Sequence, residues 1–417
     1  MTIRNGLVRC ATALVIAGSV NTISPVDAIA APEPPQLPMD DPFYAQPESL
    51  NGRAMGEVVD SRPVTLPGFS TSIPYSAWQL KYVSQNTKGT PWTTMAILLR
   101  PEEGVEPPVL YSEQLWIDSL NSRCNPSYTL RVDASGQSRS GLPSEVNNLV
   151  AALERGWTVV VPDYLGPEGE FAAGYVEGRN TLDGIRAAEN FAPAGLSGTA
   201  TPVLMYGYSG GSRGTEFGAE LAPTYAPELN IRGVAAGGLP TDMAAAAAHM
   251  NGGPFTSINM EAAFGLDRAY PELNIASYFL DSSLKQKLTS TCYTDVVSEF
   301  AFKRVEDYTV DRIWPLAVPA VAEVVESLRA GRYGTPATPM HLASAFIDEF
   351  ATVPDTDRFV ADYCARGVDV TYVKYPLAEH VSAEFQDFPH AIDWLAQRLA
   401  GAPTSSTCGA PGNARIG

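Results

Sequence analysis

Thr-Pro-Val-Leu-Met-Tyr-Gly-Tyr-Ser-Gly-Gly-Ser-Arg-Gly-Thr, residues 201–215, is the stretch that decides the fold. Its residues 203–206 form a short apolar run, which predicts a buried strand. Residues 215–221, which begin where the quoted stretch ends, are compatible with a helix. Between them, residues 207–211 read Gly-Tyr-Ser-Gly-Gly and fit the pattern G-x-S-x-G. The stretch therefore predicts a strand, a sharp turn at Ser209 and a helix.

A serine in such a turn is a candidate nucleophile. Its hydroxyl would stand at the end of the strand, and glycine at 207 and 211 would let strand and helix pack closely. The pentapeptide alone is weak evidence, because G-x-S-x-G arises by chance about 0.2 times in a chain of this length. A glycine-rich turn can also cradle a phosphate. This one lacks the G-K-[ST] ending of a P-loop and the spacing of a dinucleotide-binding loop.

Residues 1–30 have the pattern of a secretory signal peptide. Arg4 and Arg9 form a basic start, residues 11–20 are apolar, and Ala28-Ile-Ala30 fits a small-x-small cleavage site. The apolar run is too short to span a bilayer, and no later segment is long and apolar enough for an integral membrane helix. We therefore expect a secreted protein that is cleaved near Ala30.

Composition excludes several classes of partner. The formal net charge of −18 argues against nucleic acid and against attraction to anionic surfaces, so neutral substrates remain possible. Hydrophobic residues make up 45% of the chain, which is ordinary for a globular protein. About 385 residues remain after cleavage, enough for one large core with an insertion.

Four cysteines remain after cleavage, and they are Cys124, Cys292, Cys364 and Cys408. An even number in an exported chain predicts two disulfides, for which three pairings are possible. No C-x-x-C pair occurs, so we expect neither a metal site nor any other cofactor.

Predicted strands and helices alternate along most of the chain. The predicted strands are 78–83, 91–99, 108–116, 158–162, 203–206, 231–236, 340–346 and 368–375, and the main predicted helices are 146–155, 180–189, 357–365 and 391–399. This alternation predicts an α/β fold with a mostly parallel central sheet and helices on both faces. Residues 241–333 have helical patches without strand alternation, which predicts a helical insertion.

A serine nucleophile needs a base, and that base is nearly always histidine. In chains with this turn, the order is serine, acid, histidine. The four histidines are His249, His341, His380 and His390. His249 lies in an Ala-rich helical patch, His341 inside a predicted strand, and His390 at the predicted start of the last helix. His380 follows the strand 368–375 in a predicted loop, at the sheet edge where ligands of open α/β sheets bind, so we predict it as the base.

The acid that orients this histidine should follow the preceding strand. Asp348 comes just after residues 340–346, and we predict it as the acid. Asp355 and Asp357 flank a helix start, where aspartate is expected for capping alone. Glu349 remains a competitor, because neighbouring positions could exchange roles.

Two backbone N–H groups are needed to stabilise an oxyanion. Gly210, the residue after the candidate nucleophile, should supply one of them. The other should come from the loop after an early strand, and Asp118 or Ser119 in the loop after residues 108–116 is the candidate. Asp118 could equally be an ordinary turn residue.

The sequence resembles the secretory lipase family, which is typified by fungal lipase A. The matching stretches include Asn121-Ser-Arg-Cys-Asn-Pro-Ser-Tyr128 and Val160-Val-Pro-Asp-Tyr-Leu-Gly166. Others are residues 182–188, 207–211, 220–229, 233–240 and 363–373, and the pair Glu379-His380. The resemblance covers nearly all of the mature chain.

The resemblance implies an α/β-hydrolase core with an inserted helical cap. The expected division is a signal peptide at 1–30, a first part of the core with an N-terminal arm at 31–240, the cap at 241–333, and the second part of the core with the tail at 334–417. It also implies a triad of Ser209, Asp348 and His380. The implied disulfides are Cys124–Cys292 and Cys364–Cys408.

The expected function is a secreted serine carboxylic-ester hydrolase, a lipase or esterase that cleaves acyl esters such as acylglycerols through an acyl-enzyme. We expect a neutral ester or lipid as substrate, contact with a lipid interface through the cap, and a monomer. An acyltransferase with the same triad is one alternative. A secreted lipid-binding protein whose catalytic machinery has decayed is another.

Overall fold

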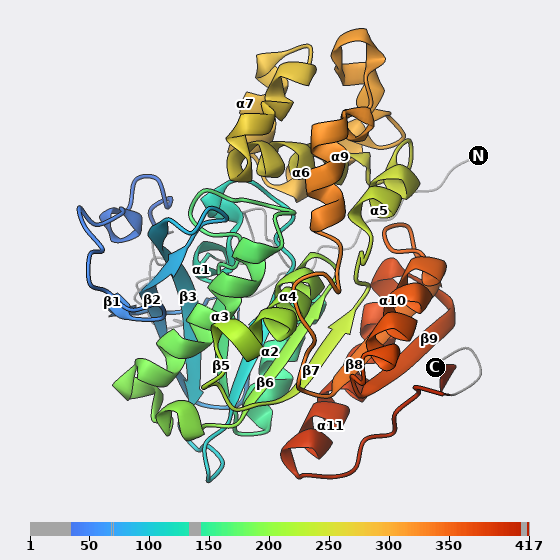
Figure 1. Ribbon diagram of the computed structural model, residues 1–417. Coiled ribbons are helices and arrows are strands. Elements are labelled where there is room, and N and C mark those ends of the chain that lie inside the picture. Colours follow the sequence, from blue (N-terminus) through green and yellow to red (C-terminus); the bar gives the residue numbers. More distant parts are fainter. Residues whose placement is uncertain (1–34, 68, 70, 133–142, 410–414, 417) are drawn as a thin grey trace, which may run out of the picture. The chain divides into compact units, whose positions relative to one another are not determined.

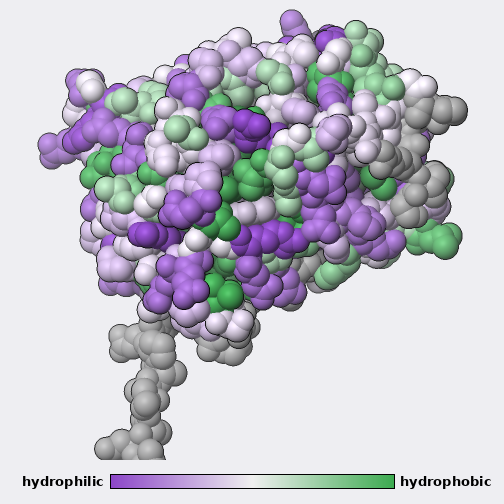
Figure 2. Space-filling model, turned by 90° about the horizontal axis from the view of Figure 1, so that it is seen from below, coloured by the Kyte–Doolittle hydropathy of each residue, from purple (hydrophilic) through white to green (hydrophobic). Residues whose placement is uncertain are grey.

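The computed structural model describes residues 35–67, 69, 71–132, 143–409 and 415–416. The predicted signal peptide, residues 1–30 with cleavage near Ala30, lies outside the described residues. Within them, no helix has the length and apolar character needed to cross a membrane. The face in Figure 2 is largely polar, with small separated hydrophobic areas.

Ten strands of the described chain form a single sheet in the order β1-β2-β3-β5-β4-β6-β7-β8-β9-β10. Their bounds are β1 Val58–Pro63, β2 Tyr75–Gln85, β3 Pro91–Pro101, β4 Leu110–Gln114, β5 Thr158–Pro162, β6 Val203–Tyr208, β7 Ile231–Gly237, β8 Met340–Ile347, β9 Val370–Glu379 and β10 Arg415–Ile416. The pairs β1–β2, β2–β3 and β3–β5 are antiparallel. All pairs from β5 and β4 through β6, β7, β8 and β9 to β10 are parallel. The prediction of a mostly parallel sheet is confirmed.

Helices cover both faces of this sheet, as the apolar run of β5 indicates. Val160 belongs to a core cluster with residues of α3 (Tyr175–Asn190) and α10 (Val353–Ala365). Val159 and Val161 belong to a second cluster with residues of α2 (Pro143–Glu154) and α11 (His380–Leu399). Because successive side chains of a strand point to opposite faces, a strand covered on both faces must be apolar throughout.

Residues 241–333 contain helices and no strand of the sheet. These helices are α5 Met243–Met250, α6 Thr256–Ala269, α7 Ser282–Ser290, α8 Tyr293–Phe300 and α9 Pro319–Ser327. Figure 1 shows α5, α6, α7 and α9 gathered beyond the end of the sheet to which β7 leads and at which α4 (Gly210–Tyr225) begins. Their buried side chains form a cluster with residues from Trp116 to Cys124 of the loop after β4. We call residues 241–333 the helical segment; that it forms a cap remains a prediction.

Two elements depart from the sequence predictions. The predicted loop at 376–380 does not exist, because β9 continues to Glu379 and α11 begins directly at His380. The helix start predicted at residue 391 is therefore wrong, and His390 lies inside α11. Glu379 caps the helix by accepting the backbone N–H groups of Val381 and Ser382, and Pro389 is accommodated within it.

The first and last strands, β1 and β10, lie at the two edges of the sheet. On the N-terminal side, β1 pairs with β2 along the sheet edge. At the other end, the backbone of β10 pairs parallel with β9. A short segment can add to an edge strand because its N–H and C=O groups are free to pair.

Both disulfides are present, as the resemblance implies. Cys124–Cys292 joins the loop after β4 to the helical segment across 168 residues of sequence, and Cys364–Cys408 joins α10 to the tail across 44. Each bond restricts the unfolded chain and so stabilises the fold.

Replacing Cys124 and Cys292 together by serine is expected to lower the free energy of unfolding by about 2–5 kcal/mol, because the closed loop is long. Urea unfolding of wild type and variant measures the change. Equal midpoints in urea would contradict this expectation. The Cys364→Ser, Cys408→Ser variant, which opens a shorter loop, is the comparison.

Candidate active site

Ser209 lies in a strained turn between β6 and α4. Its φ of 53° and ψ of −125° are unusual for a residue with a side chain, and such strain is found at functional sites. The Ser209 N–H donates to Gly237 O at 2.9 Å, which ties the turn to β7. A Cβ on Gly207 would lie 2.4 Å from Thr215 Oγ1, and one on Gly211 would lie 1.8 Å from Gln114 O. Glycine is therefore required at both positions by close packing, against α4 and against the end of β4.

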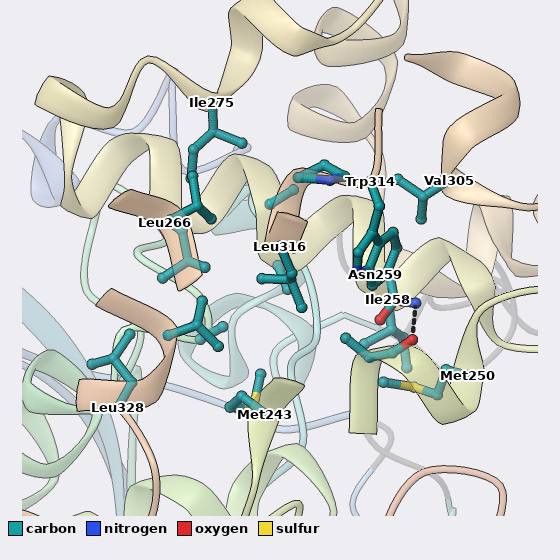
Figure 3. A pocket seen from close by; sticks show the side chains of 17 residues that line it. Met243, Met250, Ile258, Asn259, Leu266, Ile275, Val305, Trp314, Leu316 and Leu328 are labelled. Carbon is teal, nitrogen blue, oxygen red and sulfur yellow. Dashed lines mark hydrogen bonds between the residues drawn. The ribbon is translucent and has the colours of Figure 1, made fainter. Parts of the chain in front are cut away.

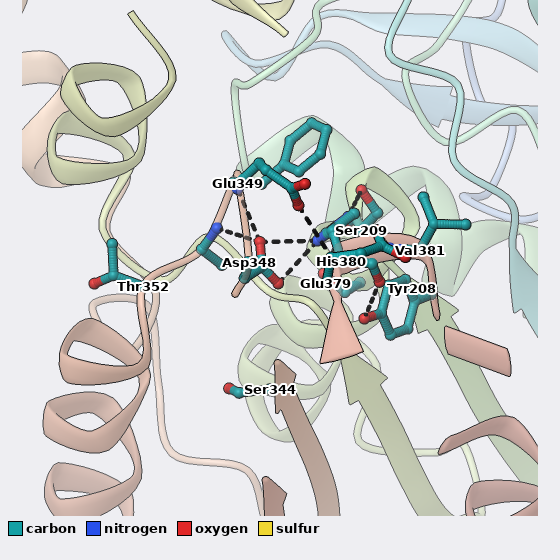
Figure 4. A network of polar contacts seen from close by, with 12 residues as sticks. Tyr208, Ser209, Ser344, Asp348, Glu349, Thr352, Glu379, His380 and Val381 are labelled. Atoms are coloured by element: carbon teal, nitrogen blue, oxygen red, sulfur yellow. Dashed lines mark hydrogen bonds and ion pairs between the residues drawn. The ribbon is translucent and has the colours of Figure 1, made fainter. Parts of the chain in front are cut away.

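His380 lies next to Ser209 although 171 residues separate them in sequence. His380 Nε2 is 2.7 Å from Ser209 Oγ, and the two contacts of Nδ1 with the Asp348 carboxylate measure 3.0 and 2.9 Å (Figure 4). Because a carboxylate only accepts, Nδ1 carries the proton and Nε2 is free to accept from the serine hydroxyl. His380 is 3% exposed, and its backbone carbonyl accepts from Tyr208 Oη at 2.7 Å.

Asp348 follows β8 directly and is held by its own loop. Its Oδ1 accepts the backbone N–H groups of Phe350 and Ala351, both at 2.8 Å. Burial would raise the pKa of Asp348, but the charge and hydrogen bond of His380, together with the two N–H groups, lower it below its ordinary value. Asp348 is therefore ionised where it meets the imidazole.

Glu349, the competing acid, makes a different contact. Its Oε2 accepts the backbone N–H of His380 at 3.2 Å, whereas the ring nitrogens bond to Asp348 and Ser209 (Figure 4). Asp355 bonds to Thr352 and Arg358 near the start of α10. Asp357 forms an ion pair with Lys374. Of the acids considered, Asp348 is the one in contact with the histidine ring.

Asp118 lies against Gly210, the residue that follows Ser209. Asp118 has a φ of 44° and is 5% exposed. A Cβ on Gly210 would lie 2.1 Å from Asp118 Oδ1, so the carboxyl group occupies the space of a side chain at 210. Burial raises the pKa of Asp118 to about 7, with Glu177 adding to the rise and with His380 and Arg213 opposing it. Ser119, the other candidate, accepts the N–H of Tyr293 through Oγ at 2.8 Å.

The other three histidines do not contact Ser209. His341 is buried in β8 and its Nε2 is 2.8 Å from Asp387 Oδ1. His390 Nδ1 is 3.1 Å from Tyr375 Oη. His249, predicted as a helix-face residue, approaches the candidate acid, since its Nε2 is 2.9 Å from Asp348 O. No local pattern could have found this contact, because 99 residues separate the pair.

Phe350 is a further residue that sequence reasoning missed. Its ring centroid is 4.1 Å from that of His380, and on the helical segment's side it stacks on Phe255 at 4.5 Å. Phe350 is 9% exposed. Among the described residues, no three His, Cys, Asp or Glu side chains come together in a way that could hold a metal ion.

Known proteins are similar to this chain in sequence. The family model described as "Secretory lipase" matches residues 137–407. A "Probable inactive lipase" of Mycobacterium tuberculosis is 35% identical over 88% of this chain and 84% of that protein. "Secreted triacylglycerol lipase LIP4" of Malassezia globosa is 32% identical over 95% of this chain and 88% of that protein.

Solved structures agree with the fold. The X-ray structure of Candida antarctica lipase A in its closed state superposes with a TM-score of 0.83 at 28% identity, over 91% of this chain and 90% of that one. The rice cell wall degrading esterase LipA of Xanthomonas oryzae matches with a TM-score of 0.66 at 17% identity, over 84% of this chain and 100% of that one. The second match, at such low identity, bears on the fold alone.

Proposed function

Because the chain belongs to the secretory lipase family, we propose that it is a secreted serine carboxylic-ester hydrolase that cleaves neutral acyl esters such as acylglycerols. One observation carries the proposal: His380 bridges Ser209 Oγ at 2.7 Å and the Asp348 carboxylate at 2.9 Å. The expected signal peptide and the secreted relatives support export. The net charge of −18 favours a neutral substrate over an anionic one.

In the proposed reaction, Ser209 Oγ attacks the ester carbonyl carbon while His380 Nε2 takes the hydroxyl proton. The resulting imidazolium is stabilised by Asp348, which keeps Nδ1–H pointed at its carboxylate. His380 then gives the proton to the leaving alcohol as the C–O bond breaks, which leaves an acyl group on Ser209. Water, deprotonated by His380, attacks this acyl-enzyme and releases the acid.

The oxyanion is assigned to two backbone N–H groups, those of Gly210 and Asp118. Gly210 is the first residue of α4, so its N–H is one of those that a helix start leaves without a partner in the helix. The positive φ of Asp118 supports a role for its loop at the turn, since strained backbone collects at such sites. Donors held in place before the reaction stabilise the negative charge that develops on the carbonyl oxygen.

The helical segment contains an apolar cavity whose lining includes neither Ser209 nor His380. An apolar cavity of about 60 Å³ lies between α5, α6 and α9 (Figure 3). Its lining includes Met243, Met250, Ile258, Leu266 and Trp314. Four aromatic residues of the segment, Phe255, Phe264, Tyr278 and Phe279, are not among the lining residues. Phe264 and Phe279 pack on one another in the segment's core instead, with ring centroids 4.7 Å apart.

A decayed lipid-binding protein is the alternative from another class, and the name of one relative, a "Probable inactive lipase", raises it. The contacts among Ser209, His380 and Asp348 favour the enzyme, since a non-catalytic protein has no need to keep a strained serine turn and an ionised acid. An acyltransferase would use the same groups with an alcohol in place of water.

Purified protein should hydrolyse p-nitrophenyl esters over a series of acyl lengths, and a fluorophosphonate should label Ser209, as located by peptide mass spectrometry. Release of acid without ester products when an alcohol acceptor is added distinguishes a hydrolase from an acyltransferase. Absence of turnover at every acyl length, together with no label on Ser209, would overturn the proposal. A preference for long chains would favour a lipase over an esterase.

The pH dependence follows from the charges around His380. Burial lowers the pKa of His380, but the charge and hydrogen bond of Asp348, with smaller contributions from Glu349 and Asp118, raise it above 6.5 overall. The reaction needs neutral imidazole, so kcat/KM should be full above this raised pKa and fall as the pH drops through it. Glu349→Gln, which removes one of the charges, should move the acid limb to lower pH. A midpoint at or below 6.5, or an upward move in the variant, would contradict this expectation.

A further inference from the structure

We propose that His249, on α5 of the helical segment, is a positioning residue for the reaction proposed above, on which this role rests. It acts by holding the backbone carbonyl of Asp348. The two residues are 99 positions apart in sequence, and His249 Nε2 lies 2.9 Å from Asp348 O. The helical segment thereby contacts the residue that orients the base.

The chemistry of the contact defines the donor. A backbone carbonyl can only accept, so His249 Nε2 carries a hydrogen and donates it. The neutral Nε2–H tautomer and the imidazolium both satisfy this requirement. The contact therefore does not depend on one protonation state of His249. His249 is an exposed residue, so its replacement leaves no cavity in the core.

Asp348 is held from three directions. The N–H groups of Phe350 and Ala351 bond to its Oδ1, and the His380 ring bonds to the same carboxylate. His249 bonds to its backbone carbonyl, outside the carboxylate. The two N–H groups fix the carboxylate relative to its own loop, whereas the His249 bond fixes that loop relative to α5. Without that bond, loop and carboxylate can shift together away from His380.

A second contact links the helical segment to the site, from the start of α6 to His380. Phe350 lies between the rings of His380, at 4.1 Å, and Phe255, at 4.5 Å, and Phe255 precedes α6. The α5–α6 pair thus contacts the acid through His249 and the base through Phe255 and Phe350. A displacement of a few tenths of an ångström in this pair would shift both His380, which takes the Ser209 proton, and Asp348, which orients His380. The reaction is sensitive to such small changes of distance.

His249→Ala is expected to lower kcat for short p-nitrophenyl esters about five- to tenfold, the factor that corresponds to one hydrogen bond. KM should stay within about twofold, since His249 does not contact the reacting atoms. The acid limb of kcat/KM should move to lower pH, because a displaced Asp348 stabilises the imidazolium less. His249→Gln, whose amide N–H can donate to the same carbonyl, should restore most of kcat and the pH profile.

A matched control removes another contact between the helical segment and the rest of the chain. Lys88 Nζ, in the β2–β3 turn, bonds to Glu272 Oε1 at 2.6 Å, and Lys88→Met should leave kcat and the pH profile unchanged. Equal loss in Lys88→Met would mean that general loosening of the segment causes the effect and would overturn the role of His249. Wild-type kcat and pH profile in His249→Ala would overturn it as well.

The proton between His380 Nδ1 and Asp348 gives a readout that needs no turnover. Its downfield NMR signal should persist in the Gln variant and shift or exchange faster with water in His249→Ala. An unchanged signal in His249→Ala would overturn the positioning role. Because this measurement does not require ester hydrolysis, a protein without esterase activity would contradict the proposed function while the signal still tests His249.

Discussion

Ser209→Ala is expected to lower kcat/KM for ester hydrolysis by about four to six orders of magnitude, because it removes the atom that forms the acyl-enzyme. The residual rate would come from the oxyanion donors and from binding alone. The structure should be unchanged, since the alanine can occupy the same strained turn, whose φ of 53° is imposed by its surroundings. Loss of the Oγ contact with His380 Nε2 leaves an acceptor that water can satisfy.

The measurement is the rate with a p-nitrophenyl ester at the wild-type optimum, with thermal unfolding followed in parallel. Ser327→Ala, at an exposed serine that ends α9, is the matched control and should match wild type. Retention of more than about a hundredth of the wild-type rate in Ser209→Ala would be incompatible with Ser209 as the nucleophile.

Gly210→Ala is expected to lower kcat about a hundredfold or more, the usual effect of losing one oxyanion donor. The new Cβ would lie 2.1 Å from Asp118 Oδ1 and 3.0 Å from its Cγ, so one of the two residues must move. Asp118 is buried, its side chain is short, and its backbone has a positive φ of 44°. Movement of either residue displaces an N–H group that the proposed mechanism assigns to the oxyanion.

A double-mutant cycle separates this clash from other effects. Asp118→Gly removes the carboxyl group, keeps the backbone N–H and tolerates the positive φ. Gly210→Ala should therefore be far less harmful in the Asp118→Gly background than in wild type. Additive losses in kcat would show that the two side-chain positions do not compete for the same space, contrary to the expectation.

The strand predictions succeeded where both faces of a strand are covered. Residues 158–162 were predicted from their apolar run and form β5 with these bounds. The family and the α/β-hydrolase fold followed from matching stretches along the chain, and both are confirmed. These features are visible in sequence because strand and helix periods and turn glycines leave local patterns.

The region around His380 was predicted less well. This region contains Pro376 and Pro389, and a loop after residue 375 and a helix from residue 391 were expected. The structure continues β9 to Glu379 and starts α11 at His380. Pairing with β8, where Ile347 lies opposite Glu379, and capping by the Glu379 side chain outweigh the local preference against proline. Tertiary context of this kind is not encoded in a short window of sequence.

By itself, the sequence determined the Ser209 turn, the order of serine, acid and histidine along the chain, and the cysteines available for two disulfides. Tertiary structure decided that Asp348 and not Glu349 meets the His380 ring, that the Asp118 carboxyl group fills the space beside Gly210, and that His249 reaches the acid. The physical reason is the distance in sequence between the residues that interact. Turns and periodic elements depend on neighbours a few residues away, whereas each of these contacts depends on how strands pair and how a distant helix packs against their ends.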